Sequence, residues 1–346
     1  FRRALVSRLK IMATLDIAER RKPQDGKIKF KMADKEIELR VATIPTTGYN
    51  EDVVMRILAA SEPVPLDKMG FTDRNLRELK RISEVPYGII LCVGPTGSGK
   101  TTTLHSVLGN INEPEWKIWT AEDPVEITQY GLRQVQVQPK IGFTFAIAMR
   151  AFLRADPDVI MVGEMRDKET AETGIEASLT GHLVLSTLHT NSAVETITRL
   201  LDMGCDPFSF ADAMLGVLAQ RLAKRLCKDC KEKYHPTKEE YDELVNAYGK
   251  DWWAKHARPA YDDKFMLYRP KGCDTCNRGG FKGRVGIHEL MIGTDNLKKL
   301  IQTKAKTEEM QHAAMEEGMT TLVQDGIEKT LNGLTTFKEV KAVAMK

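Results

Sequence analysis

Apolar residues recur at two spacings in the first part of the chain, and each spacing predicts a kind of element. Leucines and methionines follow helical spacing over residues 2–22, and residues 23–26 are expected to form a turn. Residues 27–32 and 35–42 alternate polar and apolar side chains, which is typical of half-buried antiparallel strands. Residues 53–60 are expected to add a strand or a short helix. The chain therefore opens with a small α+β unit.

Continuous apolar runs follow a connector at residues 61–85, in which a short helix is expected at 75–82. The runs are separated by helical stretches and lie at residues 88–93, 117–120, 159–162 and 183–187. Such a run is typical of a strand that is buried on both faces of a parallel sheet. Strands and helices that alternate in this way predict a doubly wound α/β domain. From Asp295 onward the pattern is helical.

Composition limits the class of protein. A chain of 346 residues suggests two or three domains, and 42% hydrophobic with 29% charged residues is ordinary for a globular protein. The formal charge of +3 gives no strong overall attraction for nucleic acid, and no apolar run approaches the ~20 residues of a transmembrane segment. The chain begins with Phe1 and reads from there as the middle of a helix, so we expect a natural N-terminal part to be missing.

One motif fits the Walker A pattern in full and lies between an expected buried strand and an expected helix. Its residues, with the threonine that follows, are Gly94, Pro95, Thr96, Gly97, Ser98, Gly99, Lys100, Thr101 and Thr102. Glycines let backbone N–H groups converge on phosphate oxygens, and the positive end of the following helix faces them. Lys100 is expected to span the β and γ phosphates of ATP, and Thr101 to coordinate Mg²⁺. A full match in this context argues against a chance glycine turn.

Acidic residues follow two other expected strands, where ligands bind in this type of fold. Glu164 comes after the run at 159–162 and is the candidate for ordering Mg²⁺ or its water; the alternative is a helix-capping glutamate. Glu122, Asp123 and Glu126 follow the run at 117–120. One of these carboxylates could polarise the attacking water, and we choose Glu126, with Glu122 next. The alternative is a solvated loop.

Histidines and arginines are candidates for groups that respond to the γ phosphate. His182 and His189 bracket an expected strand, and His189 could sense that phosphate, although a lone histidine is more often a satisfied core residue. Hydrolysis also needs positive charge near the transition state. Four arginines are candidates for this charge: Arg40, Arg56, Arg150 and Arg154. Arg150 and Arg154 are expected on one helix face, and the alternative for all four is ordinary solvation.

Two Cys-x-x-Cys pairs have the spacing of zinc knuckles. The four cysteines are Cys227, Cys230, Cys273 and Cys276. Four protein ligands close the coordination of Zn²⁺, so the predicted site is structural, and a redox dithiol is the alternative. Cys92 and Cys205 are expected to be buried, inert thiols.

The motifs together resemble the type II secretion and type IV pilus assembly ATPases (the GspE/PilB family) over nearly the whole chain. Besides the Walker A motif and the cysteines, the matching segments are Arg20-Arg21-Lys22-Pro23-Gln24-Asp25-Gly26, Glu122-Asp123-Pro124-Val125-Glu126 (the Asp box), Gly163-Glu164-Met165-Arg166-Asp167 (Walker B) and Thr180-Gly181-His182 with Leu188-His189-Thr190 (the His box). The resemblance implies that Glu126 is the catalytic glutamate and Glu164 the carboxylate on the magnesium side. It also implies that the four arginines act at the γ phosphate, and that His182 and His189 couple nucleotide state to domain movement.

The resemblance also implies a domain order around a RecA-like P-loop NTPase core. The expected parts are a truncated PAS-like second N-terminal domain at 1–62, a linker at 63–86, the ATPase core at 87–226, a tetracysteine zinc subdomain at 227–280 and a helical C-terminal region at 281–346. The enzyme would be a homohexamer that uses ATP, Mg²⁺ and Zn²⁺, lies in the cytoplasm at the inner membrane, and acts on a platform protein and a membrane-associated adaptor.

Three classes of function remain open at this point: an assembly motor, a nucleic-acid motor and a nucleotide-binding switch. Pseudopilus assembly in type II secretion leads, and a type IV pilus extension ATPase is the alternative; the tetracysteine favours either over a retraction motor. A nucleic-acid motor is a more distant alternative, which would use the basic stretch at 221–225. We expect that stretch to be a solvated helix face or a contact between subunits. No nucleic-acid partner is therefore expected. A nucleotide-binding switch without turnover is the third.

Overall fold

The structure, a computed structural model, describes residues 1–32, 35–59 and 63–345. Residues 1–62 together with 126–128 form one compact unit, and residues 63–125 with 129–346 form the other. They are called the smaller and the larger unit below. The last residue of the element expected at 53–60 and the start of the connector expected at 61–85 lie outside the described residues.

The smaller unit is a helix and a three-stranded antiparallel sheet in the order β1-β2-β3. Its elements are α1 (Arg2–Met12), β1 (Gln24–Met32), β2 (Lys35–Thr46) and β3 (Asn50–Ala59). Ala13, Ile28 and Val41 form the centre of its core. The alternating pattern thus predicted these strands correctly, and Ile28, Leu39 and Val41 pack into the one core.

Two expectations for the smaller unit are wrong. The helix expected over 2–22 ends at Met12, because Thr14 has a φ of 56°, which a right-handed helix cannot accommodate. The turn expected at 23–26 is strand instead, since Gln24 already pairs with Thr43 of β2. The Gln24 side chain donates to the backbone carbonyls of Asp16 and Glu19, and so holds the loop that replaces the second half of the helix.

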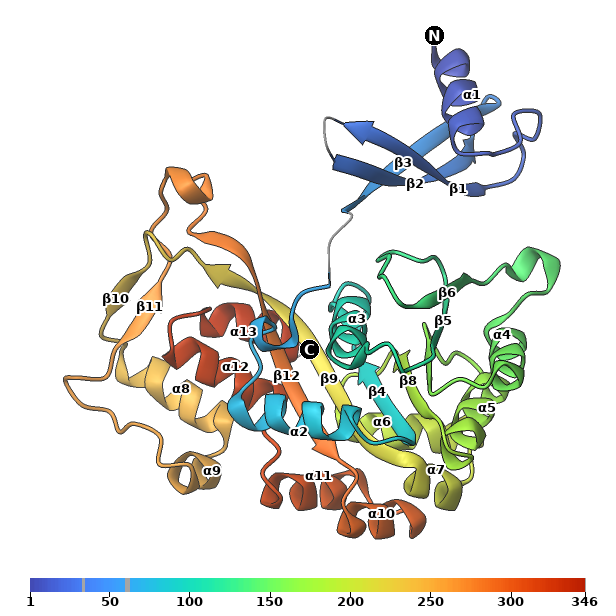
Figure 1. The fold of residues 1–346 in the computed structure, drawn as a ribbon. Helices are drawn as coiled ribbons and strands as arrows, with labels where there is room; N and C mark the ends of the chain where they lie inside the picture. The colour runs from blue at the N-terminus through green and yellow to red at the C-terminus, as the bar shows by residue number, and fades with distance from the viewer. Residues whose placement is uncertain (33–34, 60–62, 346) are drawn as a thin grey trace. The chain divides into compact units, whose positions relative to one another are not determined.

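The larger unit is built on a seven-stranded sheet (Figure 1). Its strands in spatial order are β12 (Phe281–Ile292), β9 (Met214–Leu226), β4 (Gly88–Val93), β8 (Leu183–Leu188), β7 (Val159–Val162), β5 (Ile118–Glu122) and β6 (Arg133–Gln136). All neighbours are parallel except β12, which runs antiparallel to β9. The predicted α/β domain with a parallel sheet is confirmed.

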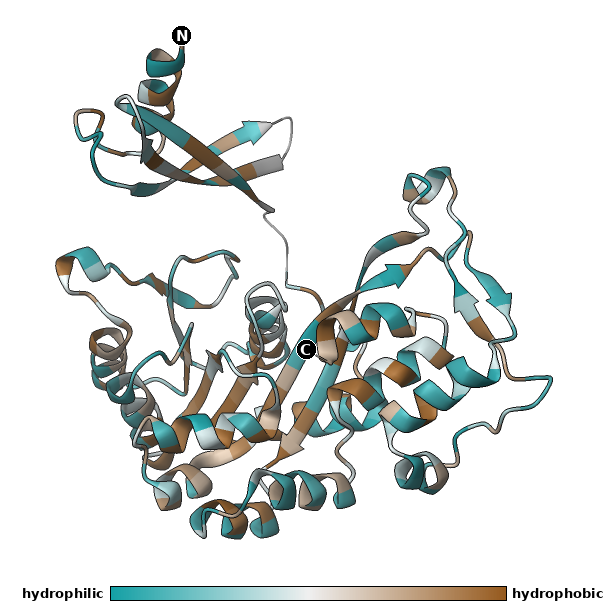
Figure 2. Cartoon of the chain, turned by 180° about the vertical axis from the view of Figure 1, so that it is seen from behind, coloured by the Kyte–Doolittle hydropathy of each residue, from teal (hydrophilic) through white to brown (hydrophobic). Residues whose placement is uncertain are grey.

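Helices cover both faces of this sheet, as the alternation of buried residues along β4 requires. Ile89 and Leu91 belong to a core shared with α5, α6 and α7, whereas Ile90 belongs to a core shared with α2 and α3. The central strands β4, β7 and β8 are fully buried, and Figure 2 shows hydrophilic residues along the helices around the sheet. The helices of the larger unit are α2 (Asp73–Ser83), α3 (Lys100–Ile111), α4 (Phe145–Phe152), α5 (Lys168–Leu179), α6 (Ala193–Asp202), α7 (Pro207–Ala213), α8 (Lys238–Tyr248), α9 (Lys250–Lys255), α10 (Asp295–Gln302), α11 (Thr307–Glu316), α12 (Leu322–Leu331) and α13 (Phe337–Ala344).

An insert between β9 and β12 carries a small aromatic core of its own. It contains the ribbon of β10 (Glu232–Tyr234) and β11 (Leu267–Arg269) together with α8 and α9. Tyr241, Tyr248 and Trp253 pack edge to face, and Ile327 of α12 closes the cluster. The aromatic residues that the sequence shows in this segment therefore stabilise it.

The sheet corrects the expectations for residues 221–225 and 281–292. The basic stretch at 221–225 lies in β9 and not on a helix, because it continues a strand paired with β4 up to Ala219 and itself pairs with β12. Residues 281–292, expected in the helical C-terminal region, form β12. The four helices after it agree with the helical pattern from Asp295 onward. Among the described residues, none of the helices has the length and apolar character needed to span a bilayer.

Candidate functional site

The phosphate loop connects β4 to α3 at the carboxyl edge of the sheet. Lys100 begins α3 and donates hydrogen bonds to the carbonyls of Gly94 (2.7 Å) and Pro95 (3.1 Å). Burial lowers the pKa of Lys100, and the nearby Cys92 and Glu164 oppose this shift. The lysine thus keeps its ammonium group inside the loop and within electrostatic reach of Glu164.

The loop has the donors that a phosphate requires. Gly99 caps α3 without a side-chain hydrogen bond, so the first N–H groups of a 12-residue helix are left for a ligand. The hydroxyl of Ser98 is buried and has no hydrogen-bond partner among the residues that the structure describes. A side chain added at Gly97 would meet no atom within 4 Å. Thr101 and Thr102 are half-buried in the first turn. These features fit a nucleotide phosphate.

Glu164 and His189 come together at the same edge of the sheet. Glu164 follows β7 and His189 follows β8, and their side chains are 3.1 Å apart from Oε1 to Nε2. Arg166 donates to the other carboxylate oxygen of Glu164 at 2.7 Å. The structure therefore brings Glu164 and His189 together at the shared edge of two adjacent parallel strands.

Glu122, our second choice as general base, is instead held inside the larger unit. Its carboxylate accepts hydrogen bonds from Thr120 (2.7 Å) and Gln134 (3.0 Å) and lies 3.2 Å from Nε2 of His105 in α3. Burial favours its neutral form, but the bonds from His105, Gln134 and Thr120 outweigh that effect and lower the pKa of Glu122. A carboxylate with three partners is better suited to joining α3 to β5 than to activating water.

Glu126, Arg40 and Arg56 belong to the smaller unit. Glu126 is half-buried in the segment 126–128. Arg40 and Arg56 are directly opposite each other on β2 and β3, and Lys27 of β1 is opposite Arg40. Directly paired residues share a face of the sheet, so three cations form a row across it. Arg40 pairs with Asp25 at 3.6 Å. The assigned roles of Glu126, Arg40 and Arg56 stay predictions.

The structure does not place His182, Arg150 and Arg154 at the phosphate loop. His182 precedes β8, at the end of the strand opposite to His189, roughly 20 Å away. Its Nδ1 lies 2.9 Å from the carbonyl of Ala177. Arg150 ends α4 and pairs with Glu169 at 2.7 Å, while Arg154 lies in the following 3₁₀ turn and donates to the carbonyl of Arg150. Both arginines are exposed, so the structure does not add these three residues to the phosphate loop.

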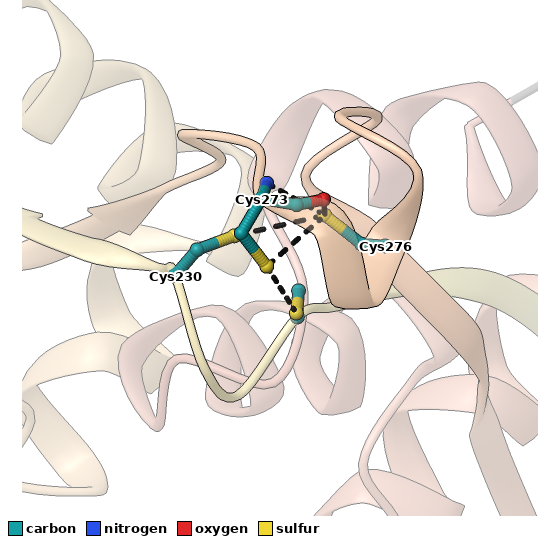
Figure 3. A group of neighbouring side chains, drawn as sticks. Cys230, Cys273 and Cys276 are labelled. Carbon is teal, nitrogen blue, oxygen red and sulfur yellow. Dashed lines mark hydrogen bonds between the residues drawn. The ribbon is translucent and has the colours of Figure 1, made fainter.

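The four cysteines of the two pairs form one cluster between β9 and β12. Their sulfur atoms all lie within 4.8 Å of one another. Cys227 and Cys273 are 3.9 Å apart, and Cys230 and Cys276 are 3.8 Å apart, as Sγ–Sγ distances. In Figure 3 the sulfurs of the three labelled cysteines face one another. Tetrahedral Zn²⁺ with bonds of about 2.3 Å requires sulfurs about 3.8 Å apart, so the cluster fits zinc in size.

Backbone donors add to the thiolate character of this cluster. The N–H groups of Cys273 and Gly280 each donate to Sγ of Cys276 at 3.2 Å. Burial works against ionisation, but these bonds lower the pKa of the Cys276 thiol to about 7. Burial raises the pKa of the other two thiols, Cys92 (to about 12) and Cys205, as expected for inert cysteines.

Sequence reasoning missed two buried polar residues beside the phosphate loop. Gln220 and Arg221 lie in β9, the strand next to β4. Arg221 was considered only as part of the basic stretch at 221–225, and no motif points to Gln220. A polar pair directly after the apolar part of β9 was the one available signal.

Proteins of known function resemble this chain over nearly all its length. The type II secretion system ATPase E of Vibrio cholerae is 45% identical over 344 residues, which cover 98% of this chain and 65% of that protein. The type IV pilus assembly ATPase PilB of Myxococcus xanthus is 48% identical over 341 residues, which cover 98% of this chain and 58% of that protein. The chain therefore spans less than two thirds of either relative.

Solved structures agree on the fold. The pilus retraction motor PilT with bound ADP superposes with a TM-score of 0.66 at 27% identity, over 93% of this chain and 77% of that one. The ATPase DotB of Yersinia pseudotuberculosis gives 0.69 at 20% identity, over 98% of this chain and 81% of that one, and so indicates the fold alone. The family model described as "Type II/IV secretion system protein" matches residues 1–342, and the chain belongs to that family.

Proposed function

We propose that this chain is the motor part of an ATPase that drives pseudopilus assembly in type II secretion. The observation that carries the proposal is the meeting of the phosphate loop, Lys100, Glu164 and His189 at one edge of the sheet. The named activities of the relatives from Vibrio cholerae and Myxococcus xanthus support it.

Each residue at this edge has a role in the proposed reaction. The uncapped N–H groups of α3 and the Lys100 ammonium bind the phosphates of ATP and stabilise the charge that develops on them. Thr101 and Glu164 would hold Mg²⁺ or its water, and Mg²⁺ would neutralise charge on the phosphates. His189 contacts Glu164 and so registers the orientation of that carboxylate. Thr102 completes the lining of the loop.

Glu126 is the proposed general base. The three partners of Glu122 support this choice, because they hold Glu122 in a scaffolding position. We expect Glu126→Gln to bind ATP normally and to lose hydrolysis. Glu172→Gln, on the exposed surface of α5, serves as the control and should hydrolyse at the wild-type rate. Normal hydrolysis by Glu126→Gln would refute Glu126 as the general base. Loss of hydrolysis in Glu172→Gln alone would place the essential carboxylate on α5 instead.

Arginines supply the further positive charge that the proposed reaction needs near the γ phosphate. The row formed by Lys27, Arg40 and Arg56 supports a role for the smaller unit in binding the γ phosphate, because it gathers three cations on one face. Lys27 and Arg40 also pair with Glu38 and Asp25, so the full charge of the row is not available to an anion. Exposed Arg150 and Arg154 are proposed to act across a contact with a neighbouring copy in a homohexamer, and His182 to couple nucleotide state to that contact. Arg56→Ala should lower the hydrolysis rate without weakening ATP binding, and light scattering should detect the hexamer.

The cysteine cluster is proposed to hold a structural zinc ion with Cys227, Cys230, Cys273 and Cys276 as its ligands. The spacing of the sulfurs and the N–H groups aimed at Cys276 support this proposal. Zinc would join the end of β9 to the start of β12. The proposed setting is the cytoplasmic face of the inner membrane, with a platform protein and an adaptor as partners.

Two other functions have specific observations for or against them. A type IV pilus extension ATPase is supported as well by the relative from Myxococcus xanthus, and neighbouring pilin or pseudopilin genes would distinguish the two. A nucleic-acid motor is disfavoured, since Arg221 is buried and Lys224 pairs with Glu339, which removes two cations from the basic stretch. A large stimulation of ATP hydrolysis by DNA would overturn this choice.

A further inference from the structure

Gln220 of β9 lies directly beside the phosphate loop and has no role so far. Val93, the last residue of β4, pairs with Ala219, so that Gln220 is the next residue along and lies beside Gly94. The side chain of Gln220 is almost fully buried in a strand that is otherwise apolar here. Burying an amide is costly unless it is hydrogen-bonded, so its partners indicate what it does.

Gln220 uses both ends of its amide on the loop and its helix. Nε2 donates to the carbonyl of Ser98 at 2.7 Å, and Oε1 accepts from the hydroxyl of Thr103 at 2.6 Å. The loop and the first turn of α3 are thereby fixed to one side chain. An amide is suited to this task because it has a donor and an acceptor that stay in place at any pH.

The glycines of the loop show how closely it packs on Gln220. A Cβ at Gly94 would lie 2.5 Å from the carbonyl oxygen of Gln220, and a Cβ at Gly99 would lie 2.8 Å from its Nε2. Both glycines also have positive φ, of 151° and 90°. Larger residues at 94 or 99 would therefore push the loop away from β9.

The bond to Ser98 also orients the loop. In a trans peptide the carbonyl and the following N–H point in opposite directions. Because the Ser98 carbonyl points toward Gln220, the N–H of Gly99 points away from Gln220 and β9. Without this bond the peptide could rotate and present a carbonyl oxygen to the phosphate, which would repel it.

Arg221, the next residue, fixes β9 from its other face, since successive side chains of a strand alternate. Its guanidinium donates to the carbonyl of Asn191, two residues after His189, at 2.9 Å, and to the carbonyl of Val343 in α13 at 3.1 Å. The position of Gln220 is thus tied to the loop after β8 and to the C-terminal helix, all within the larger unit.

We propose that Gln220 is a positioning residue that holds the phosphate loop in its binding conformation and so sets nucleotide affinity. The proposal rests on the proposed function, in that the loop binds nucleotide. A purely structural role would predict lost stability without a specific change in affinity. Gln324 of α12 is the matched control: it is as deeply buried, donates to the carbonyl of Tyr248 at 3.0 Å, and lies in a different part of the unit.

The test compares Gln220→Met with Gln324→Met in the full chain, with ADP binding measured by calorimetry and stability by urea unfolding. Both variants should lose stability, but only Gln220→Met should weaken ADP binding, by about tenfold or more, equivalent to ~1.4 kcal/mol. Binding within twofold of the wild type, or equal weakening in both variants, would overturn the proposal. If the wild type itself does not bind ADP, the proposed function fails, and the positioning role fails with it.

A second variant keeps the test decisive if Gln220→Met does not fold. In Gln220→Glu the ionised carboxylate faces the Ser98 carbonyl and repels it, whereas the protonated acid can donate to that oxygen as glutamine does. Burial raises the pKa of such a carboxyl, so ADP affinity should be low at pH 8 and recover toward pH 6 more than that of the wild type. An affinity with the same pH dependence as the wild type would overturn the proposal.

Discussion

The buried pair of His105 and Glu122 predicts a stability loss that is not additive. Glu122 has three hydrogen-bond partners, and His105 is the one that comes from α3. Removing it with His105→Leu leaves the carboxylate with two partners in a site that water does not reach. A hydrogen bond to a charged group contributes about 1.5–3 kcal/mol, and the loss should lie at the upper end because both side chains are buried.

A double-mutant cycle measures this coupling. Glu122→Gln removes the charge and should cost about 1–2 kcal/mol, but the double variant should cost little more than His105→Leu alone, because a neutral amide needs its histidine partner less. We therefore expect a coupling of about 1–2 kcal/mol between the two sites, nearly the whole cost of Glu122→Gln. Urea unfolding followed by tryptophan fluorescence is a suitable assay, since Trp119 stacks on Phe152 in the same strand region.

A control variant separates the pair from a general effect of losing histidine. His312→Leu removes an exposed histidine of α11 that is 4.0 Å from Glu316, and an exposed pair at this distance should contribute less than about 0.5 kcal/mol. Single-variant losses of His105→Leu and Glu122→Gln that add to the double-variant loss within about 0.5 kcal/mol would refute the reasoning.

Three further outcomes are expected. The pKa of Glu122 is lowered from 4.5 in the folded protein, so its stabilising effect is complete above pH 4.5 and is lost as the pH falls through the folded pKa. Glu122→Gln should therefore lose less stability than the wild type as the pH falls from 5 to acid unfolding. Parallel acid-unfolding curves of the two proteins would contradict this. Lys329→Met leaves Asp325 buried without its cation and should cost about 3–5 kcal/mol in urea unfolding; a loss under about 1 kcal/mol would contradict it. Complete chelation of metal should expose residues 227–280 to hydrogen exchange and leave the central sheet protected, whereas unchanged exchange and melting would count against a structural zinc.

The sequence predicted the centre of the larger unit well because its signals there are local. An apolar run such as Gly88–Val93 is buried on both faces, and the glycine motif after it needs no distant partner to be recognised. The same holds for the four cysteines, whose spacing alone indicates one metal site. The sequence also predicted Glu164 and His189 at strand ends, and their contact arises because those strands are parallel neighbours.

The sequence predicted poorly wherever distant pairing decides the structure. The stretch at 221–225 contains residues compatible with a helix, but pairing with the distant strand β12 holds it in a strand, and no local pattern indicates that neighbour. The helix expected over 2–22 ends early because of one left-handed residue, Thr14. Gln220 has no motif of its own, because its role depends on the carbonyl of Ser98, which is 122 positions away in the chain.

The central claim is that ATP is bound and hydrolysed at the loop that contains Lys100. Phosphate release in the presence of Mg²⁺ and ATP, measured for the wild type and for Lys100→Ala, tests it most directly, with Lys168→Ala as the control from the exposed start of α5. The account predicts steady release by the wild type and the control, and none above background by Lys100→Ala. Equal release by all three proteins would contradict it.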